Sequence, residues 1–134
     1  MSDMTNALEE LTINVFFRGS SHTGGQLWAA LFTAAPGETG GGTEASGGWY
    51  ARQSPGATPS TAWADPTGTG ITSNATQLAW SPVTGSSSTV VAVAVMTASS
   101  GGNMWMYKVL GASVVYNVGD IPIILANGLQ VQMQ

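Results

Sequence analysis

Two glutamates in a glycine-rich stretch are the first residues of this sequence that could do chemistry. Glu38 and Glu44 lie within PGETGGGTEASGG at 36–48. A pair of carboxylates hydrolyses glycosides when rigid elements hold the two groups about 5–9 Å apart and one of them has a raised pKa. The glycines instead predict a solvated loop, in which neither carboxylate is held or desolvated. We therefore expect no catalytic pair here.

The same glycine run does not fit a phosphate-binding loop. The pattern G-x-G-x-x-G places Ala45 where the third glycine should be, and no Gly-Lys-Ser/Thr follows. Two acidic side chains would also repel a phosphate group. We expect the run to be architectural, a turn whose glycines adopt positive φ angles between two regular elements.

The sequence offers few residues for metal binding or nucleophilic catalysis. His22 is the only histidine and there is no cysteine, so a zinc site would need carboxylates in its remaining positions. The surrounding GSSHTGG indicates a loop without the nucleophile-elbow pattern. Asp65 precedes a proline and Asp120 follows a glycine, so turn formation explains both. We expect no metal, no cofactor and no enzymatic activity.

The composition indicates which classes of molecule this chain binds. Only 7% of the 134 residues are charged, against about 25% in an average soluble domain. The net charge is −4 and the three basic residues are spread along the chain, so neither nucleic acid nor an anionic membrane surface is expected as a partner. A surface this neutral is typical of a protein that packs against other proteins.

The first element that the sequence predicts is a short N-terminal helix over residues 4–18. Its apolar residues recur every three to four positions and form one stripe of Leu8, Leu11, Val15 and Phe16. Asn6 is the expected N-cap and Gly19 the expected end. A single amphipathic helix beside a small β domain has an apolar face that needs a partner surface. We therefore expect the helix to take part in assembly with other subunits.

From residue 25 onward the pattern changes to short strands separated by turn residues. The expected strands are 25–33, 49–53, 77–83, 88–97, 104–110, 112–117, 120–125 and 129–134. Pro122 indicates an edge or a bulge in its strand, and residues 54–76 form a long Pro/Gly/Ser/Thr-rich loop. The sequence thus predicts a mainly β single domain over 1–134, an antiparallel β-sandwich or jelly-roll-like fold at 25–134 with one short N-terminal α-helix.

The five tryptophans could fill a core or contact a partner. Trp28, Trp80 and Trp105 lie within expected strands, where core packing is the expected role. Trp49 and Trp63 border loops, so we expect these two on a partner surface.

Blocks spread over nearly the whole chain carry a resemblance to known proteins. The most specific block is GTEASGGWYARQ at 42–53. The others are AALFTAAP at 29–36, ITSN at 71–74, TASSGGNMWMYKVLGA at 97–112, NVGDIPI at 117–123 and ANGLQVQM at 126–133. In this order they resemble a family of small virion proteins of tailed bacteriophages, labelled tail fibre or decoration proteins. This chain departs from the family pattern at Trp49, where the family usually has a glycine. The resemblance implies a non-enzymatic virion component with a β-rich fold.

The glycine-rich segment can then be interpreted as part of that architecture. Glu44 and Arg52 bracket the second half of the loop and could pair across it, contributing about 0–1 kcal/mol if the pair is exposed. Tyr50 would anchor the following strand in the core or at a subunit interface. The candidate interface residues are Phe16, Phe17, Arg18, Trp49, Tyr50, Arg52 and Trp63.

Two functions are compatible with this resemblance. The first is a capsid cement or decoration protein, bound as a homotrimer to the major capsid protein on the exterior of the icosahedral head. We favour it because the chain is small and neutral and has neither a fibre repeat nor a coiled coil. The alternative is a tail-associated appendage or short receptor-binding tail fibre, in which Trp63 and the loop 54–76 would contact a host-surface glycan.

Overall fold

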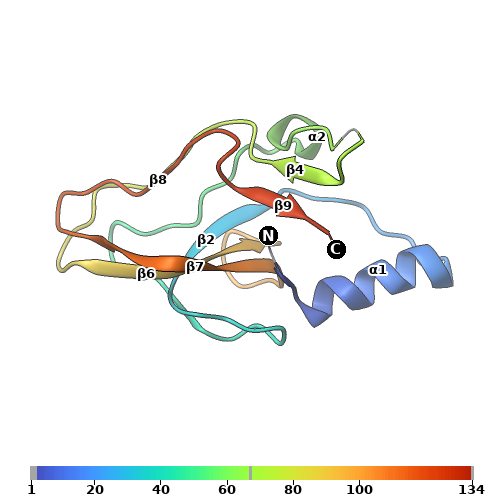
Figure 1. Cartoon of the computed structure of the whole chain (residues 1–134), viewed down its shortest axis with the longest axis horizontal. Helices are drawn as coiled ribbons and strands as arrows, with labels where there is room; N and C mark the ends of the chain where they lie inside the picture. The colour runs from blue at the N-terminus through green and yellow to red at the C-terminus, as the bar shows by residue number, and fades with distance from the viewer. Residues whose placement is uncertain (1–2, 67, 134) are drawn as a thin grey trace.

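A five-stranded antiparallel sheet forms the centre of the fold (Figure 1). The computed structural model describes residues 3–66 and 68–133. The order across the sheet is β1-β7-β6-β2-β3. Its strands are β1 (Asp3–Met4), β2 (Trp28–Ala34), β3 (Thr43–Glu44), β6 (Ser88–Met96) and β7 (Met104–Tyr116). The sheet is open, because its two edge strands are only two residues long and do not meet.

Two small antiparallel ribbons lie on one side of this sheet (Figure 1). β4 (Ile71–Ser73) pairs with β9 (Gln130–Gln132), and β5 (Leu78–Ala79) pairs with β8 (Ile123–Ile124). The sheet, the ribbons and their connections share one core, made of Ala29, Leu31, Ala45, Trp49, Leu78, Trp80, Val83 and Val90. The expected mainly β, antiparallel fold with one short N-terminal helix is confirmed.

The opposite face of the sheet carries a second apolar cluster. Its buried members are Ala30, Phe32, Ala92, Ala94, Met96 and Met104. Since alternate residues of β2 and β6 enter the two clusters, both strands are buried on both faces, as their unbroken apolar runs predict. A pocket opens over this second face.

Helix α1 spans Asn6–Arg18, close to the expected 4–18. Its N-cap is Thr5 rather than the expected Asn6, and the Thr5 side chain makes no capping hydrogen bond because it bonds to β7 instead. Gly19 ends the helix in the left-handed conformation, as expected, and its N–H bonds to the carbonyl of Asn14. No residue of the helix is buried.

Two segments differ from their expected structure. Residues 49–53 do not form a strand, and a single antiparallel bridge between Ala29 and Gln53 ties them to β2. The expected loop at 54–76 contains β4 and a short helix, α2 (Pro59–Ala62). Thr67 within that loop lies outside the described residues.

The last expected strands are shorter than the sequence pattern indicates. The strands expected at 77–83, 120–125 and 129–134 are reduced to β5, β8 and β9, and Gln134 lies outside the described residues. Pro122 sits directly before β8 and is buried, and its carbonyl accepts a hydrogen bond from the N–H of Trp80 at 3.0 Å. A proline can still contribute this acceptor at a strand end, although it has no N–H to donate.

β7 joins the two strands expected on either side of Gly111. Opposite it, β6 contributes one residue, Val91, where β7 contributes four, 110–113. Such an irregularity is a β-bulge, which bends the strand that holds the extra residues. On its outer side, β7 pairs with β1 only at Met106 and Tyr107. Among the described strands, none covers the outer edge of β7 beyond those residues.

Candidate interaction surface

Helix α1 has two apolar faces that point in opposite directions. Leu8, Leu11 and Val15 are half-buried on the side that faces the rest of the chain. At 3.6 residues per turn, Ile13, Phe16 and Phe17 fall on the other side. These three are exposed, Phe16 by 77% and Phe17 by 83%. The expectation that Phe16 belongs to the inner stripe is therefore wrong, because its position lies about a quarter-turn or more from that stripe.

The N-terminal end of α1 is fixed to the body by Thr5. The Thr5 N–H donates to the carbonyl of Trp105 at 2.9 Å, and its hydroxyl donates to the carbonyl of Met104 at 2.5 Å. The N–H of Asn6 donates to the carbonyl of Glu38 at 2.9 Å. From this anchored end the helix extends away from the sheet, as Figure 1 shows. Its exposed phenylalanines thus lie at the projecting end.

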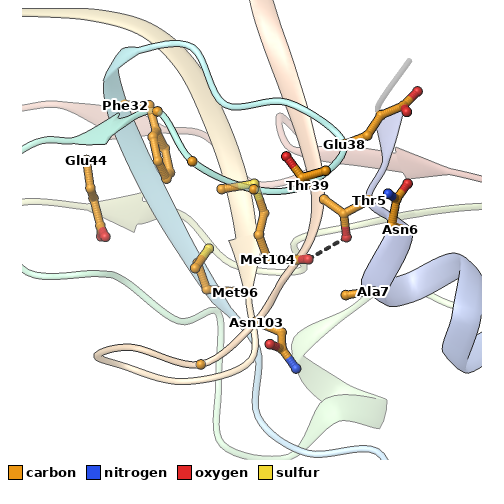
Figure 2. A pocket seen from close by; sticks show the side chains of 14 residues that line it. Thr5, Asn6, Ala7, Phe32, Glu38, Thr39, Glu44, Met96, Asn103 and Met104 are labelled. Atoms are coloured by element: carbon orange, nitrogen blue, oxygen red, sulfur yellow. Dashed lines mark hydrogen bonds between the residues drawn. The ribbon is translucent and has the colours of Figure 1, made fainter.

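A pocket of about 550 Å³ lies between the start of α1, the glycine-rich loop and the second face of the sheet (Figure 2). Phe32, Met96 and Met104 contribute its apolar lining. Glu38 is exposed at its rim, and Glu44 lies on the opposite side of the pocket. The pocket thus has a largely buried apolar floor and a polar rim, on which Glu38 carries a negative charge while Glu44 is paired with Arg52. Such a site suits an apolar group that carries a nearby positive charge.

The glycine-rich loop forms one wall of this pocket through three successive residues with positive φ. Gly40, Gly41 and Gly42 have φ angles of 85°, 78° and 76°, which confirms the expected conformation of the loop. At Gly42 a side chain is also blocked by space, because an added Cβ would lie 2.6 Å from the carbonyl oxygen of Ala34. At Gly41 an added Cβ would meet nothing within 4 Å.

The predicted pair of Glu44 and Arg52 forms, and it is more than a surface ion pair. Arg52 Nε and Nη2 donate to Glu44 Oε1 and Oε2, both at 2.8 Å. Arg52 Nη1 also donates to the carbonyls of Ala98 and Gly101, both at 2.7 Å. Its side chain is only 7% exposed. A bidentate and mostly buried arginine of this kind fixes geometry as well as charge.

Tyr50 completes this network from the core side. Its hydroxyl donates to Glu44 Oε1 at 2.6 Å and accepts from the N–H of Leu31 at 3.1 Å. Burial alone would raise the pKa of Glu44, but the hydrogen bonds from Arg52 and Tyr50 outweigh it, so the pKa lies below the ordinary value of 4.5. Burial and the hydrogen bond to Glu44 raise the pKa of Tyr50 above its ordinary value of 10.0. Glu44 is thus held as a carboxylate, in a structural role.

The structure separates the candidate interface residues into two groups. Phe16, Phe17 and Arg18 are exposed together at the end of α1. Tyr50 and Arg52 lie in the polar network around Glu44. The two groups are on different elements and do not form one surface.

The two tryptophans expected on a partner surface differ in their exposure. Trp49 is 4% exposed and belongs to the main core, where its ring meets Tyr50 edge-on at a centroid distance of 5.5 Å. Trp63 is half-buried beside α2 and forms a backbone bridge with Asn74. The side chain of Trp49 is therefore not open to a partner in this fold.

Asn74 is a structural residue that the sequence reasoning did not single out. Its side chain is fully buried and joins β4 to the segment between β8 and β9. Its Nδ2 donates to the carbonyls of Thr76 and Leu125 at 2.8 and 3.0 Å, and its Oδ1 accepts from the N–H of Leu129 at 2.8 Å. In the sequence it ends the ITSN block at 71–74 and begins an Asn-Ala-Thr triplet at 74–76, and neither pattern indicates a buried side chain.

The remaining candidates for chemistry lie apart from one another. His22 is exposed, and its ring lies 5.6 Å from that of Trp105. Within residues 3–66 and 68–133 there is no group of three or more His, Cys, Asp or Glu side chains that could hold a metal ion. Over the same residues, no helix has the length and apolar character to cross a membrane.

Comparison with known proteins finds a match to one protein family. The model of a protein family described as podophage GP4 fiber I protein gp80 matches residues 3–132. The matched range includes helix α1, the pocket and the network around Glu44. Among curated proteins, none matches the chain.

Proposed function

The chain belongs to the podophage GP4 fiber I protein gp80 family, and from this premise we propose that it is a globular structural subunit of a phage fibre. The family match supports the expected role of a structural protein of a phage virion. It spans residues 3–132, which is almost all of the described chain. This extent is the observation on which the proposal depends.

The fibre role replaces capsid cement as the function that we favour. The sequence has neither a fibre repeat nor a coiled coil. This absence favours cement only if a fibre protein must itself form the shaft. A small β domain can instead be one globular unit in a fibre, joined to its neighbours through exposed apolar surface. The family description supports this alternative more than a position on the head.

The surface of the chain fits a subunit that contacts other proteins at both of its ends. At one end, α1 exposes Phe16 and Phe17. At the other end, the last part of β7 and the connection to β8 expose Val115, Val118 and Ile121 by 49–60%. Contiguous exposed apolar groups are uncommon on isolated domains and mark protein-binding sites.

The proposed partners follow from this surface and from the charge. We assign copies of the same chain and a neighbouring virion protein as partners, and neither nucleic acid nor membrane, because the three basic residues are dispersed. The role is non-catalytic, with the carboxylate of Glu44 committed to Arg52 and Tyr50. Contact with a host glycan through Trp63 would be a further property of the same fibre.

The proposal is tested on purified particles of the phage that encodes this chain. Quantitative mass spectrometry gives the copy number relative to the major capsid protein, and gold-labelled antibody shows the location by electron microscopy. A copy number that is a small multiple of the fibre symmetry, with label on the tail, supports the proposal. A number close to one per capsid subunit, with label on the head, would restore the cement function.

A further inference from the structure

We infer that the projecting end of helix α1 inserts into the pocket of a second copy of this chain. The inserted group is the end of α1, where Phe16 and Phe17 on the outer face are followed by Arg18, the last residue of the helix. The receiving site is the pocket with the apolar lining of Phe32, Met96 and Met104 and the rim residue Glu38. The inference deepens the proposed function, because it names one contact by which subunits of the fibre would join.

The geometry of the helix directs this contact to another copy. The pocket is lined by the first residues of α1, Thr5 to Ala7. Phe16 follows Asn6 by ten residues, which corresponds to about 15 Å along a straight helix. Thr5 holds the near end of the helix against β7. The phenylalanines therefore project away from their own pocket and can fill only that of a neighbour.

The chemistry of the two parts is complementary. Phe16 and Phe17 are the most exposed large apolar side chains among the described residues. The floor of the pocket contains one phenylalanine and two methionines, each less than 10% exposed, which an inserted ring would meet beneath the polar rim. Methionine side chains adapt their shape and contact aromatic rings favourably. The pocket volume of about 550 Å³ lies within the range of about 300–1,000 Å³ that is typical of binding sites.

The charges on the two parts also match. The chain has three basic residues, and Arg52 is committed to Glu44 and two carbonyls. Arg18 directly follows the exposed phenylalanines. Glu38 lies exposed on the rim of the receiving pocket, with its side chain turned away from the floor in Figure 2. An inserted helix end would bring Arg18 toward an acidic rim in a chain that otherwise carries few charges.

The contact joins two different surfaces, so it propagates from copy to copy. Each chain contributes its helix end to one neighbour and this pocket to another, and a head-to-tail contact of this type closes into a ring or continues as a filament. Either outcome is a way to build a multi-subunit fibre from a small domain. The rotation between neighbours decides which of the two forms.

The inference is tested by mixing two variants that each lack one part of the contact. F16S/F17S removes the inserted group and keeps the pocket. T39W fills the pocket from an exposed position on its wall and keeps the inserted group. Sedimentation velocity should show a self-associating wild-type chain and two variants that are each monomeric. Their mixture should form a one-to-one heterodimer and nothing larger, because only one complete contact is available.

Loss of one buried phenylalanine should weaken the association about tenfold to a hundredfold. L125S removes a comparably exposed apolar side chain from the segment between β8 and β9 and should leave the helix–pocket contact intact. Circular dichroism and the melting temperature show whether each variant is folded. R18E and E38R should each weaken association at low salt, and the double variant should restore it.

Two results would overturn the inference. One is a wild-type chain that stays monomeric at all attainable concentrations, and the other is a mixture of F16S/F17S and T39W that does not associate although both are folded. Neither result would affect the location of the protein in the particle, which copy number and labelling report independently. A fibre subunit could then join its neighbours by another surface.

Discussion

The glycine-rich segment 36–53 and helix α1 flank the same pocket, but the chain holds them by different means. Segment 36–53 contains two residues of regular strand, yet Trp49 is buried in the core and Arg52 makes four hydrogen bonds. Helix α1 has three turns of regular structure, yet none of its residues is buried. Regular secondary structure therefore does not measure how firmly a segment is attached. Burial of one large side chain and a satisfied polar network show how firmly a segment is attached.

The largest effect is expected from W49A. Removing a buried tryptophan from a core costs about 3–5 kcal/mol of unfolding free energy. Urea denaturation followed by fluorescence of the remaining tryptophans would measure it. Replacement of the half-buried Trp105 by alanine is the matched control and should cost clearly less. A loss below about 1 kcal/mol for W49A would mean that the loop is not held by its tryptophan.

The next effect is expected from the ion-pair network. R52M should lower the unfolding free energy by about 2 kcal/mol, because it leaves Glu44 partly buried with one remaining donor, Tyr50. The variant E44Q/R52M should lose less than the sum of the two single variants, since each single change leaves a partner uncompensated. Strictly additive losses would show that the two side chains do not act as a unit.

A pair of alanine substitutions separates steric blocking from backbone strain in the loop. G41A should cost about 1–2 kcal/mol, because the residue keeps a positive φ angle and an alanine there is strained. G42A should cost about 1–3 kcal/mol more, because its Cβ would collide with the carbonyl of Ala34 as well. Chemical denaturation of both variants measures the difference. Equal losses would mean that the loop shifts to accept the Cβ.

The two regions should also differ in their response to pH. The lowered pKa of Glu44 means that its contribution to stability is fully present above about pH 4.5 and is lost as the pH falls through the folded value. The raised pKa of Tyr50 means that its contribution is present below about pH 10 and is lost as the pH rises further. A plot of unfolding free energy against pH should therefore fall at both its acid and its alkaline end. R52M should reduce the fall at the acid end, whereas F17S should leave both ends of the plot unchanged.

The smallest effect on the isolated chain is expected from the helix. F17S should change the unfolding free energy by less than about 0.5 kcal/mol, because the side chain is already in solvent. Thermal unfolding of the dilute monomer measures this. A large loss would show that the outer face of α1 packs within its own chain, which would contradict the comparison between the two regions.

The parts of the fold that depend on neighbouring residues in sequence could be predicted. Helix α1 and strands β2 and β6 follow from their local apolar periodicity. The pair of Glu44 and Arg52 was predictable because a short glycine-rich turn separates them. The sequence pattern also placed the helix end at Gly19, where an αL residue is needed.

The parts that depend on distant residues could not be predicted. Trp49 is buried because residues from β5 and β6 form its surroundings, and no local pattern contains that information. The direction of Phe16 was missed because its spacing from Leu8 resembles that of the inner stripe. Asn74 bonds to residues more than fifty positions away. The pocket likewise requires α1, segment 36–53 and the sheet to be assembled first.

The bulge in β7 has a consequence for how such a chain avoids misassembly. A long, uncharged strand with an open outer side is a template on which further copies can add by backbone pairing, and repeated addition leads to cross-β fibrils. Residues 110–113 interrupt that edge, and Lys108 places a charge just before the interruption. In the piece before the bulge, β1 covers Met106 and Tyr107, and only residues 114–116 of β7 follow the bulge. Association between copies of such a chain is then limited to side-chain contacts, whose geometry restricts where a neighbour can attach.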